Sequence, residues 1–334
     1  MTDPTPTHLL NRRRLLQGAA AATLAGPAWL PAQAQTAAWP SKPVRILTPF
    51  TAGGAADVAA RGLAAILQAN GKQPVNVEPK PGADGALAAQ ELLRAPADGH
   101  TLYFATASAL SYVPNIRRSA GYTLADFAPV TSFVVFTFYL MVHESIPGRT
   151  LAEAVAHIKA NPGKFSYGSG NSTALLGGAQ LAASAGLDLA HVPYKGESQA
   201  VPDLLGGRVH LMWASPAVMP ALAKDGKFRP LAALLPERSA AFPDVPTIAE
   251  AGQPLVNLVP WGGFVAPAAT PRDVVAAANR ALVEAMRHPD MRGPAERAGV
   301  VVGGSTPEAF QKQLNDQLAA FAAAIKQAKL PIEG

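Results

Sequence analysis

Segments with strand character alternate with segments of helix character along most of this chain. The first half predicts strands at Val75–Glu78 and Thr101–Ala105 with a helix at Ala86–Leu93 between them, and a long strand from Val130 to Val142. Such alternation is typical of α/β proteins with mostly parallel sheets and helices on both faces. The sequence therefore predicts α/β architecture.

The pattern restarts after residue 142. Further strands are expected at Phe165–Gly168, Leu189–Tyr194, Val209–Trp213, Arg229–Leu235, Trp261–Val265 and Val300–Val302, and further helices at Leu151–Ala160, Leu175–Ser184, Ala200–Leu205, Ala217–Lys224, 248–251, Pro271–Arg287 and Pro307–Lys326. Two such blocks predict two lobes, one of residues 35–141 plus 262–334 and one of residues 142–261. Because ligands bind beyond the carboxyl ends of strands in open α/β sheets, we expect one site in a cleft between the lobes.

The first 34 residues have the features of an export signal. Three consecutive arginines at 12–14 precede a mildly apolar stretch, and Ala32-Gln33-Ala34 offers small residues for a signal peptidase. Paired arginines followed by two leucines are typical of twin-arginine export. The alternative is a membrane anchor, but Pro27 and Pro31 leave too short an apolar run to span a bilayer. We therefore expect a cleaved signal and a periplasmic protein.

Composition excludes several kinds of site. The chain has no cysteine, which excludes disulfides and thiolate metal sites. Its formal net charge of +5 over 334 residues is too small a basic excess for a nucleic-acid partner. The seven histidines are scattered without metal-ligand spacing, and no Gly-x-Ser-x-Gly sequence occurs. We therefore predict no catalytic residue, no metal site and no cofactor.

Two glycine-bearing turns have the chemistry of anion-binding loops. The first, Gly53-Gly54, joins a strand beginning at Val44 to a helix. Adjacent glycines let another group approach the backbone, and a helix start presents unpaired N–H groups with partial positive charge. The second turn, Tyr167–Thr173, repeats this order and adds hydroxyl and amide donors for a carboxylate. It lacks the lysine of a phosphate-binding loop, so nucleotide binding is not predicted.

Each of these features has a structural alternative. The first turn could be an ordinary strand-to-helix connection, and Ser172 or Thr173 could simply cap a helix. A third segment, 191–196, is a strand that ends in a Lys-Gly pair. Its Lys195 could be a solvated surface charge, and its His191 a core or surface histidine.

Seven short motifs follow one another along the chain. They are WPSKPVRI at 39–46, PFTAGG at 49–54 with Asp57 and Arg61, PADGHTL at 96–102, HVPYKG at 191–196, DLLGG at 203–207, FPDVPTIAEAG at 242–252 and WGGFVAP at 261–267. In this order and spacing the sequence resembles the Bug family of periplasmic solute receptors, the extracytoplasmic component of tripartite tricarboxylate transporters. The resemblance covers nearly all of the chain after residue 34. It implies a two-lobed receptor, of the type II periplasmic binding protein kind, that closes over a small carboxylate.

The resemblance also implies which residues bind the ligand. In the family, a ligand carboxylate is held by backbone N–H groups and ordered waters at the glycine-bearing loop, and a loop of the second lobe faces it. Transferred by position, the expected ligand-binding residues are Thr51, Ala52, Gly53, Gly54, Asp57, Thr106, Ser108, Ser169, Asn171, Ser172, Thr173, Lys195 and Ser215.

Several positions depart from the family pattern. Thr51 replaces a proline, while Leu175, Ala179 and Ala214 stand where a histidine, a glutamate and an aspartate are common. The loss of these polar groups leads us to hypothesise a more apolar pocket that suits an aromatic or longer acid.

The resemblance implies partners as well. We expect a monomer that delivers its small carboxylate ligand to the membrane permease of a tripartite tricarboxylate transporter. Two alternatives remain open at this point: a receptor that presents its closed form to a membrane sensor kinase, and a secreted enzyme that acts on a carboxylate. Because no nucleophile with a base, carboxylate pair or metal-ligand set is evident, the enzyme is the weaker alternative.

Overall fold

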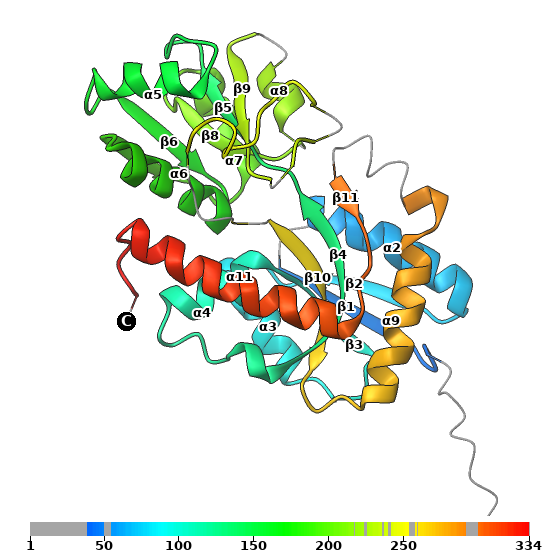
Figure 1. Ribbon diagram of the computed structural model, residues 1–334. Helices are drawn as coiled ribbons and strands as arrows, with labels where there is room; N and C mark the ends of the chain where they lie inside the picture. The colour runs from blue at the N-terminus through cyan, green and yellow to red at the C-terminus, as the bar shows by residue number, and fades with distance from the viewer. Residues whose placement is uncertain are drawn as a thin grey trace, which may run out of the picture. The chain divides into compact units, whose positions relative to one another are not determined.

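The structure, a computed structural model, describes residues 39–49, 55–216, 218–223, 226–235, 237–239, 242–253, 258, 260–291 and 300–333 (Figure 1). The predicted export signal, residues 1–34, lies outside the described residues. In the part of the chain that is described, no helix combines the length and the apolar character needed to cross a membrane.

The described strands form two sheets. The six-stranded sheet has the order β11-β4-β10-β3-β1-β2 and consists of β1 Val44–Thr48, β2 Val75–Pro79, β3 Thr101–Thr106, β4 Phe127–Phe136, β10 Trp261–Pro267 and β11 Val300–Val302. The five-stranded sheet has the order β7-β6-β8-β5-β9 and consists of β5 Tyr139–His143, β6 Phe165–Ser169, β7 Leu189–Pro193, β8 Leu211–Ala214 and β9 Phe228–Ala233.

Most strands of each sheet run in one direction. β1 is parallel to β2 and β3, and β6 is parallel to β7 and β8. The exceptions are β10 and β11 in the first sheet and β5 in the second. β5 and β10 are the first strands after the chain passes from one sheet to the other. Each of them starts at the edge of the sheet where the neighbouring strands end. It therefore runs antiparallel to those neighbours.

The change of sheet corrects one sequence prediction. The single strand expected from Val130 to Val142 is two strands, β4 and β5, separated at Thr137 and Phe138, and they belong to different sheets. The boundaries expected after residues 141 and 261 thus fall inside β5 and β10.

Helices cover both faces of each sheet, as predicted. They are α2 Ala55–Gly71, α3 Ala86–Leu93, α4 Val113–Ile116, α5 Leu151–Lys159, α6 Ser172–Ala185, α7 Glu197–Leu205, α8 Met219–Ala223, α9 Arg272–Met286 and α11 Pro307–Gln327, with short helical turns η1 Ala83–Gly85, η2 Ser108–Tyr112 and η3 Leu124–Asp126. Residues 248–251, where a short helix was predicted, form a turn instead.

Successive side chains of a strand point to opposite faces of its sheet, so one strand contributes to the apolar clusters on both faces. On β3, Leu102 and Phe104 join an apolar cluster with α2 and α9, whereas Tyr103 and Ala105 face a second cluster with α3 and α11. In the five-stranded sheet, Trp213 of β8 lies in that second cluster too, which therefore contains residues from both sheets. One of the apolar clusters is thus shared by the two sheets.

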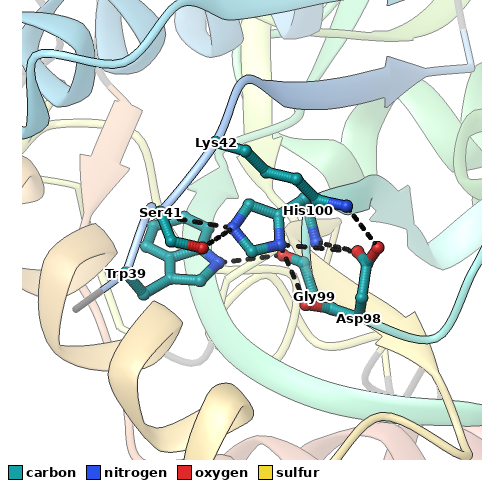
Figure 2. A network of polar contacts seen from close by, with 6 residues as sticks. All are labelled: Trp39, Ser41, Lys42, Asp98, Gly99 and His100. Atoms are coloured by element: carbon teal, nitrogen blue, oxygen red, sulfur yellow. Dashed lines mark hydrogen bonds and ion pairs between the residues drawn. The ribbon is translucent and has the colours of Figure 1, made fainter. Parts of the chain in front are cut away.

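Two of the family-like motifs contact each other just before β1 and β3 (Figure 2). Trp39 donates its ring N–H to the carbonyl of Gly99 at 3.0 Å, and Lys42 forms an ion pair with Asp98 at 2.7 Å. The backbone N–H of Ser41 donates to Nε2 of His100 at 3.2 Å. This network holds the segment that leads into β1 against the turn that precedes β3. The two motifs therefore form one structural unit.

Candidate functional site

Two serine hydroxyls from different sheets meet. Ser108 begins η2, which starts two residues after the end of β3, and Ser172 is the first residue of α6, which follows β6. Ser172 donates to Oγ of Ser108 at 2.5 Å, and both residues are buried. The carboxyl ends of β3 and β6 therefore bring together two of the predicted ligand-binding residues, one from each sheet.

The start of α6 is organised by Asn171. Its backbone is extended, and its Oδ1 accepts a hydrogen bond from the backbone N–H of Ala174 at 2.9 Å. Asn171 is therefore the helix cap, not Ser172 or Thr173 as sequence analysis had considered. Because Asn171 provides the cap, the hydroxyl of Ser172 is available to reach the other sheet, while Thr173 is buried in the first turn.

Glu197, which sequence analysis did not select, connects Asn171 with Ser215. Its Oε1 accepts from Nδ2 of Asn171 at 2.9 Å, and its Oε2 accepts from the backbone N–H and the hydroxyl of Ser215 at 3.0 and 2.6 Å. Burial raises the pKa of Glu197, and the hydrogen bonds from Ser215 and Asn171 oppose that shift. Glu197 thus holds the ends of β6 and β8 together.

Sequence analysis missed Glu197 because the helix was expected to start at Ala200. α7 begins at Glu197 itself, after an extended Gly196. An acidic residue directly after a strand-ending glycine is a helix-start signal that could have identified it.

The loop that carries Asn171 packs against this helix start through its backbone. A Cβ atom at Gly170 would lie 2.3 Å from the backbone nitrogen of Glu197 and 2.5 Å from the carbonyl carbon of Gly196. Only glycine fits such an approach without a shift of one loop. The N-termini of α6 and α7 are therefore adjacent.

Ser169, at the end of β6, belongs to a second polar group. Its Oγ lies 2.8 Å from Nε2 of His191, and the ring of His191 stacks on Tyr167 with the centroids 4.9 Å apart. Burial lowers the pKa of His191, which favours the neutral ring. The pair offers a hydroxyl and an imidazole, both uncharged, next to the loop of Asn171.

The first sheet contributes three buried polar atoms. Oγ1 of Thr48 at the end of β1, Oγ1 of Thr106 at the end of β3 and Nε1 of Trp261 at the start of β10 have no hydrogen-bond partner among the described residues. Gly262 pairs with Thr106, which places the last two at the same edge of the sheet. Because buried polar groups are almost always hydrogen-bonded, these atoms indicate a place for water or ligand.

Of the remaining predicted ligand-binding residues, four are not described, one is buried and one is exposed. Thr51, Ala52, Gly53 and Gly54 lie outside the described residues. Asp57 is buried in the first turn of α2, where its Oδ2 accepts from Nε of Arg61 at 2.8 Å. Lys195 is exposed and forms no hydrogen bond or ion pair with a described residue, so the structure does not bring it into contact with the others.

The described residues show no metal centre at this place. No group of three or more His, Asp or Glu side chains among them could hold a metal ion. Two cavities lie away from the serine pair, one of about 310 Å³ beside β2 and α3 and one of about 200 Å³ between α9 and β11.

The two α/β sheets, the two passages of the chain between them and the polar loops that meet from both sheets define a two-lobed periplasmic binding protein. Residues 56–330 match the family model described as "Tripartite tricarboxylate transporter family receptor". The chain therefore belongs to the family of tripartite tricarboxylate transporter receptors. The resemblance noted in the sequence is confirmed.

Relatives and solved structures agree with this assignment. A Cupriavidus necator protein described as "UPF0065 protein in gbd 5'region" is 39% identical over 278 residues, which cover 82% of this chain and 84% of the relative. An R. palustris protein solved with adipate is 30% identical, with a TM-score of 0.79 and coverage of 87% of this chain and 98% of the other. The periplasmic binding protein BugD is 28% identical with a TM-score of 0.77, covering 88% and 99%.

Proposed function

We propose that this chain is an exported solute receptor that binds a small carboxylic acid between its two lobes and delivers it to the membrane permease of a tripartite tricarboxylate transporter. The hydrogen bond between Ser172 and Ser108 carries the proposal, because it joins loops that follow strands of different sheets. Membership of the receptor family and the adipate bound to the R. palustris relative support a carboxylate as the ligand.

Binding is coupled to closure of the lobes. Backbone N–H groups of the Gly53-Gly54 loop grip the carboxylate from the first lobe, together with the hydroxyl of Thr106, which has no hydrogen-bond partner among the described residues. The loop of Ser172 then completes the site from the second lobe. A ligand that contacts both lobes favours the closed form by the difference between its affinities for the two states. The receptor acts as a monomer in the periplasm after twin-arginine export.

Binding is tested by titration calorimetry of the purified protein with a panel of aliphatic and aromatic acids, together with mass spectrometry of any acid that co-purifies. We expect at least one acid to bind and to be recovered chemically unchanged after incubation. An enzyme would convert it. Absence of binding by every acid in the panel, with none co-purified, would contradict the proposed function.

The glycine-bearing loop is tested separately. Gly53→Val should lose binding of the acid that the wild type binds, because the side chain would occupy the place of the ligand carboxylate. Gly303→Val is the matched control, since a Cβ at Gly303 meets nothing within 4 Å. A folded Gly53→Val protein with wild-type affinity would remove this loop from the site.

A further inference from the structure

The cavity of about 310 Å³ beside β2 and α3 is lined by a face of α3 that the core does not use. Leu87, Gln90, Glu91 and Arg94 line it, and their spacing of i, i+3, i+4 and i+7 places them on one face of the helix. The residues that α3 buries in the core are Ala86, Ala88, Ala89 and Leu92. The cavity face of α3 is therefore not required for core packing.

This cavity has an apolar part that is open to solvent. Leu87 is 51% exposed and is one of three large hydrophobic side chains that are exposed among the described residues. Pro79, at the end of β2, and Pro81 add apolar rings and have no N–H to donate. Such a surface favours contact with an apolar side chain of a partner.

The cavity also has one positive charge that nothing in the described structure balances. Oε1 of Glu91 lies 3.6 Å from Nη2 of Arg45 and 3.9 Å from Nζ of Lys80. Arg45 forms a second ion pair with Glu78 at 2.8 Å, so these two cations and two carboxylates compensate one another. Arg94 is exposed, and no hydrogen bond or ion pair joins its side chain to a described residue. The surface therefore complements a carboxylate.

Its position is next to the edge of the first sheet at which we expect the ligand. Pro79 pairs with Thr48, the last residue of β1, and the N–H of Lys80 donates to the carbonyl of Thr48 at 2.8 Å. The Gly53-Gly54 loop follows Thr48 in the sequence. A partner that docks on the cavity thus contacts the first lobe one strand away from the start of that loop.

On the basis of the proposed function, we propose that the surface formed by Pro79, Lys80, Pro81, Leu87 and Arg94 docks the membrane permease, through a permease segment that carries an apolar side chain beside a carboxylate. The apolar side chain packs on Leu87 and the two prolines, and the carboxylate pairs with Arg94, whose guanidinium can bind it through two parallel hydrogen bonds. Loops of membrane proteins on the outer side carry few Lys and Arg residues, so a cationic surface on an exported receptor meets little repulsion there.

The test separates docking from ligand binding. Each variant replaces the wild-type chain in cells that carry the permease, and uptake is measured with the radiolabelled form of an acid that the purified wild type binds in calorimetry. Leu87→Asp and Arg94→Glu should each lower the initial rate of uptake by about 10-fold, as expected for side chains at the centre of an interface. The calorimetric affinity of both variants for the acid should equal that of the wild type, which also shows that they fold. Arg94→Lys, which keeps the charge, should retain most of the uptake.

Two control variants change the same kinds of residue elsewhere on the first lobe. Arg280→Glu alters an exposed arginine of α9, which packs on the other face of the sheet from α3. Val301→Asp alters an exposed apolar side chain of β11, at the edge of the sheet opposite β2. Both controls should take up the acid at the wild-type rate.

Wild-type uptake in both Leu87→Asp and Arg94→Glu would overturn the inference and leave the proposed function intact. Weaker binding of the acid by these two variants would place the cavity in the ligand site and would overturn the inference as well. Flotation of the purified protein with phosphatidylglycerol vesicles tests membrane lipid as the partner, and co-flotation that Arg94→Glu abolishes would contradict a protein partner. If cells without the receptor take up the acid as fast as wild-type cells, the proposed delivery to a permease falls together with the inference.

Discussion

Gly170 is the residue at which the two loops of the second lobe touch through their backbones. Its φ is not in the left-handed region, so the requirement for glycine is purely one of space. A Cβ there would meet the backbone of Glu197 at 2.3 Å, and neither loop can move without disturbing hydrogen bonds of Asn171 and Ser215. The shape of the site therefore depends on a residue that offers no side chain.

We predict that Gly170→Ser destabilises the protein by about 1–3 kcal/mol, the usual cost of overpacking. Gly196→Ser is the control in the same pair of loops, because a Cβ at Gly196 meets nothing within 4 Å and serine is a good helix cap. Chemical denaturation of both variants measures the difference. Equal stability of the two proteins would show that the loops are not in contact at Gly170.

Single residues also show what sequence reasoning can and cannot reach. Ser172 could be chosen because glycine, hydroxyl and helix-start signals are local in the sequence, whereas Ser108 was chosen only by its position in the family pattern. Glu197 could not be given its role in this way, because its partners Asn171 and Ser215 lie 26 and 18 residues away. Pairing over such separations is decided by how strands are ordered in the sheet.

At the scale of elements, the hydrophobic pattern is enough to predict most helices and strands. α3 has the predicted bounds, and α9 and α11 agree with prediction within about one residue at their ends. The continuous apolar run from Val130 to Val142 conceals the passage between sheets, because buried strands of both sheets have the same composition. Only the strand pairing in the structure shows that β4 and β5 belong to different sheets.

One end of the five-stranded sheet contains two histidines that accept backbone hydrogen bonds. Nδ1 of His143 accepts from the N–H of Ser145, and Nδ1 of His210 accepts from the N–H of Ser166, each at 3.2 Å. The two rings lie 6.4 Å apart. Burial lowers the pKa of both histidines, and for His210 the neighbouring His143 lowers it further. Protonation at Nδ1 would replace an acceptor with a donor.

We therefore predict that acid destabilises the protein through these histidines. Their folded-state pKa lies below the unfolded value of about 6.5, so their contribution to stability is complete above that pH and is lost as the pH falls towards the folded pKa. The free energy of unfolding, measured by urea denaturation from pH 7.5 to 5, should fall less steeply in His210→Gln than in the wild type. Exposed His288 supplies the control, and His288→Gln should keep the wild-type slope. An unchanged slope in His210→Gln would contradict the assignment.

At the scale of the whole molecule, contacts link the elements of the two sheets. Besides the serine pair, Gln180 of α6 donates to Oε1 of Gln327 at the end of α11 at 3.0 Å. One apolar cluster also includes residues of both sheets. If the proposed function holds, ligand exchange requires some of these contacts to open, and the pair of Ser108 and Ser172 is the one nearest the predicted ligand.

The absence of cysteine from the chain makes this opening directly testable. The hydrogen bond of 2.5 Å between the two Oγ atoms brings these side chains together, so we expect Ser108→Cys with Ser172→Cys to form a bridge on oxidation with diamide. We predict that the oxidised double variant neither takes up added acid nor releases acid bound before oxidation, because the two loops can no longer separate. Reduction with dithiothreitol should restore exchange, and each single variant should exchange ligand under both conditions. Mass spectrometry verifies the bridge, and desalting followed by quantification of retained acid measures exchange. A bridged protein that exchanges its acid as fast as the reduced form would show that ligand enters by a route that does not require these loops to part.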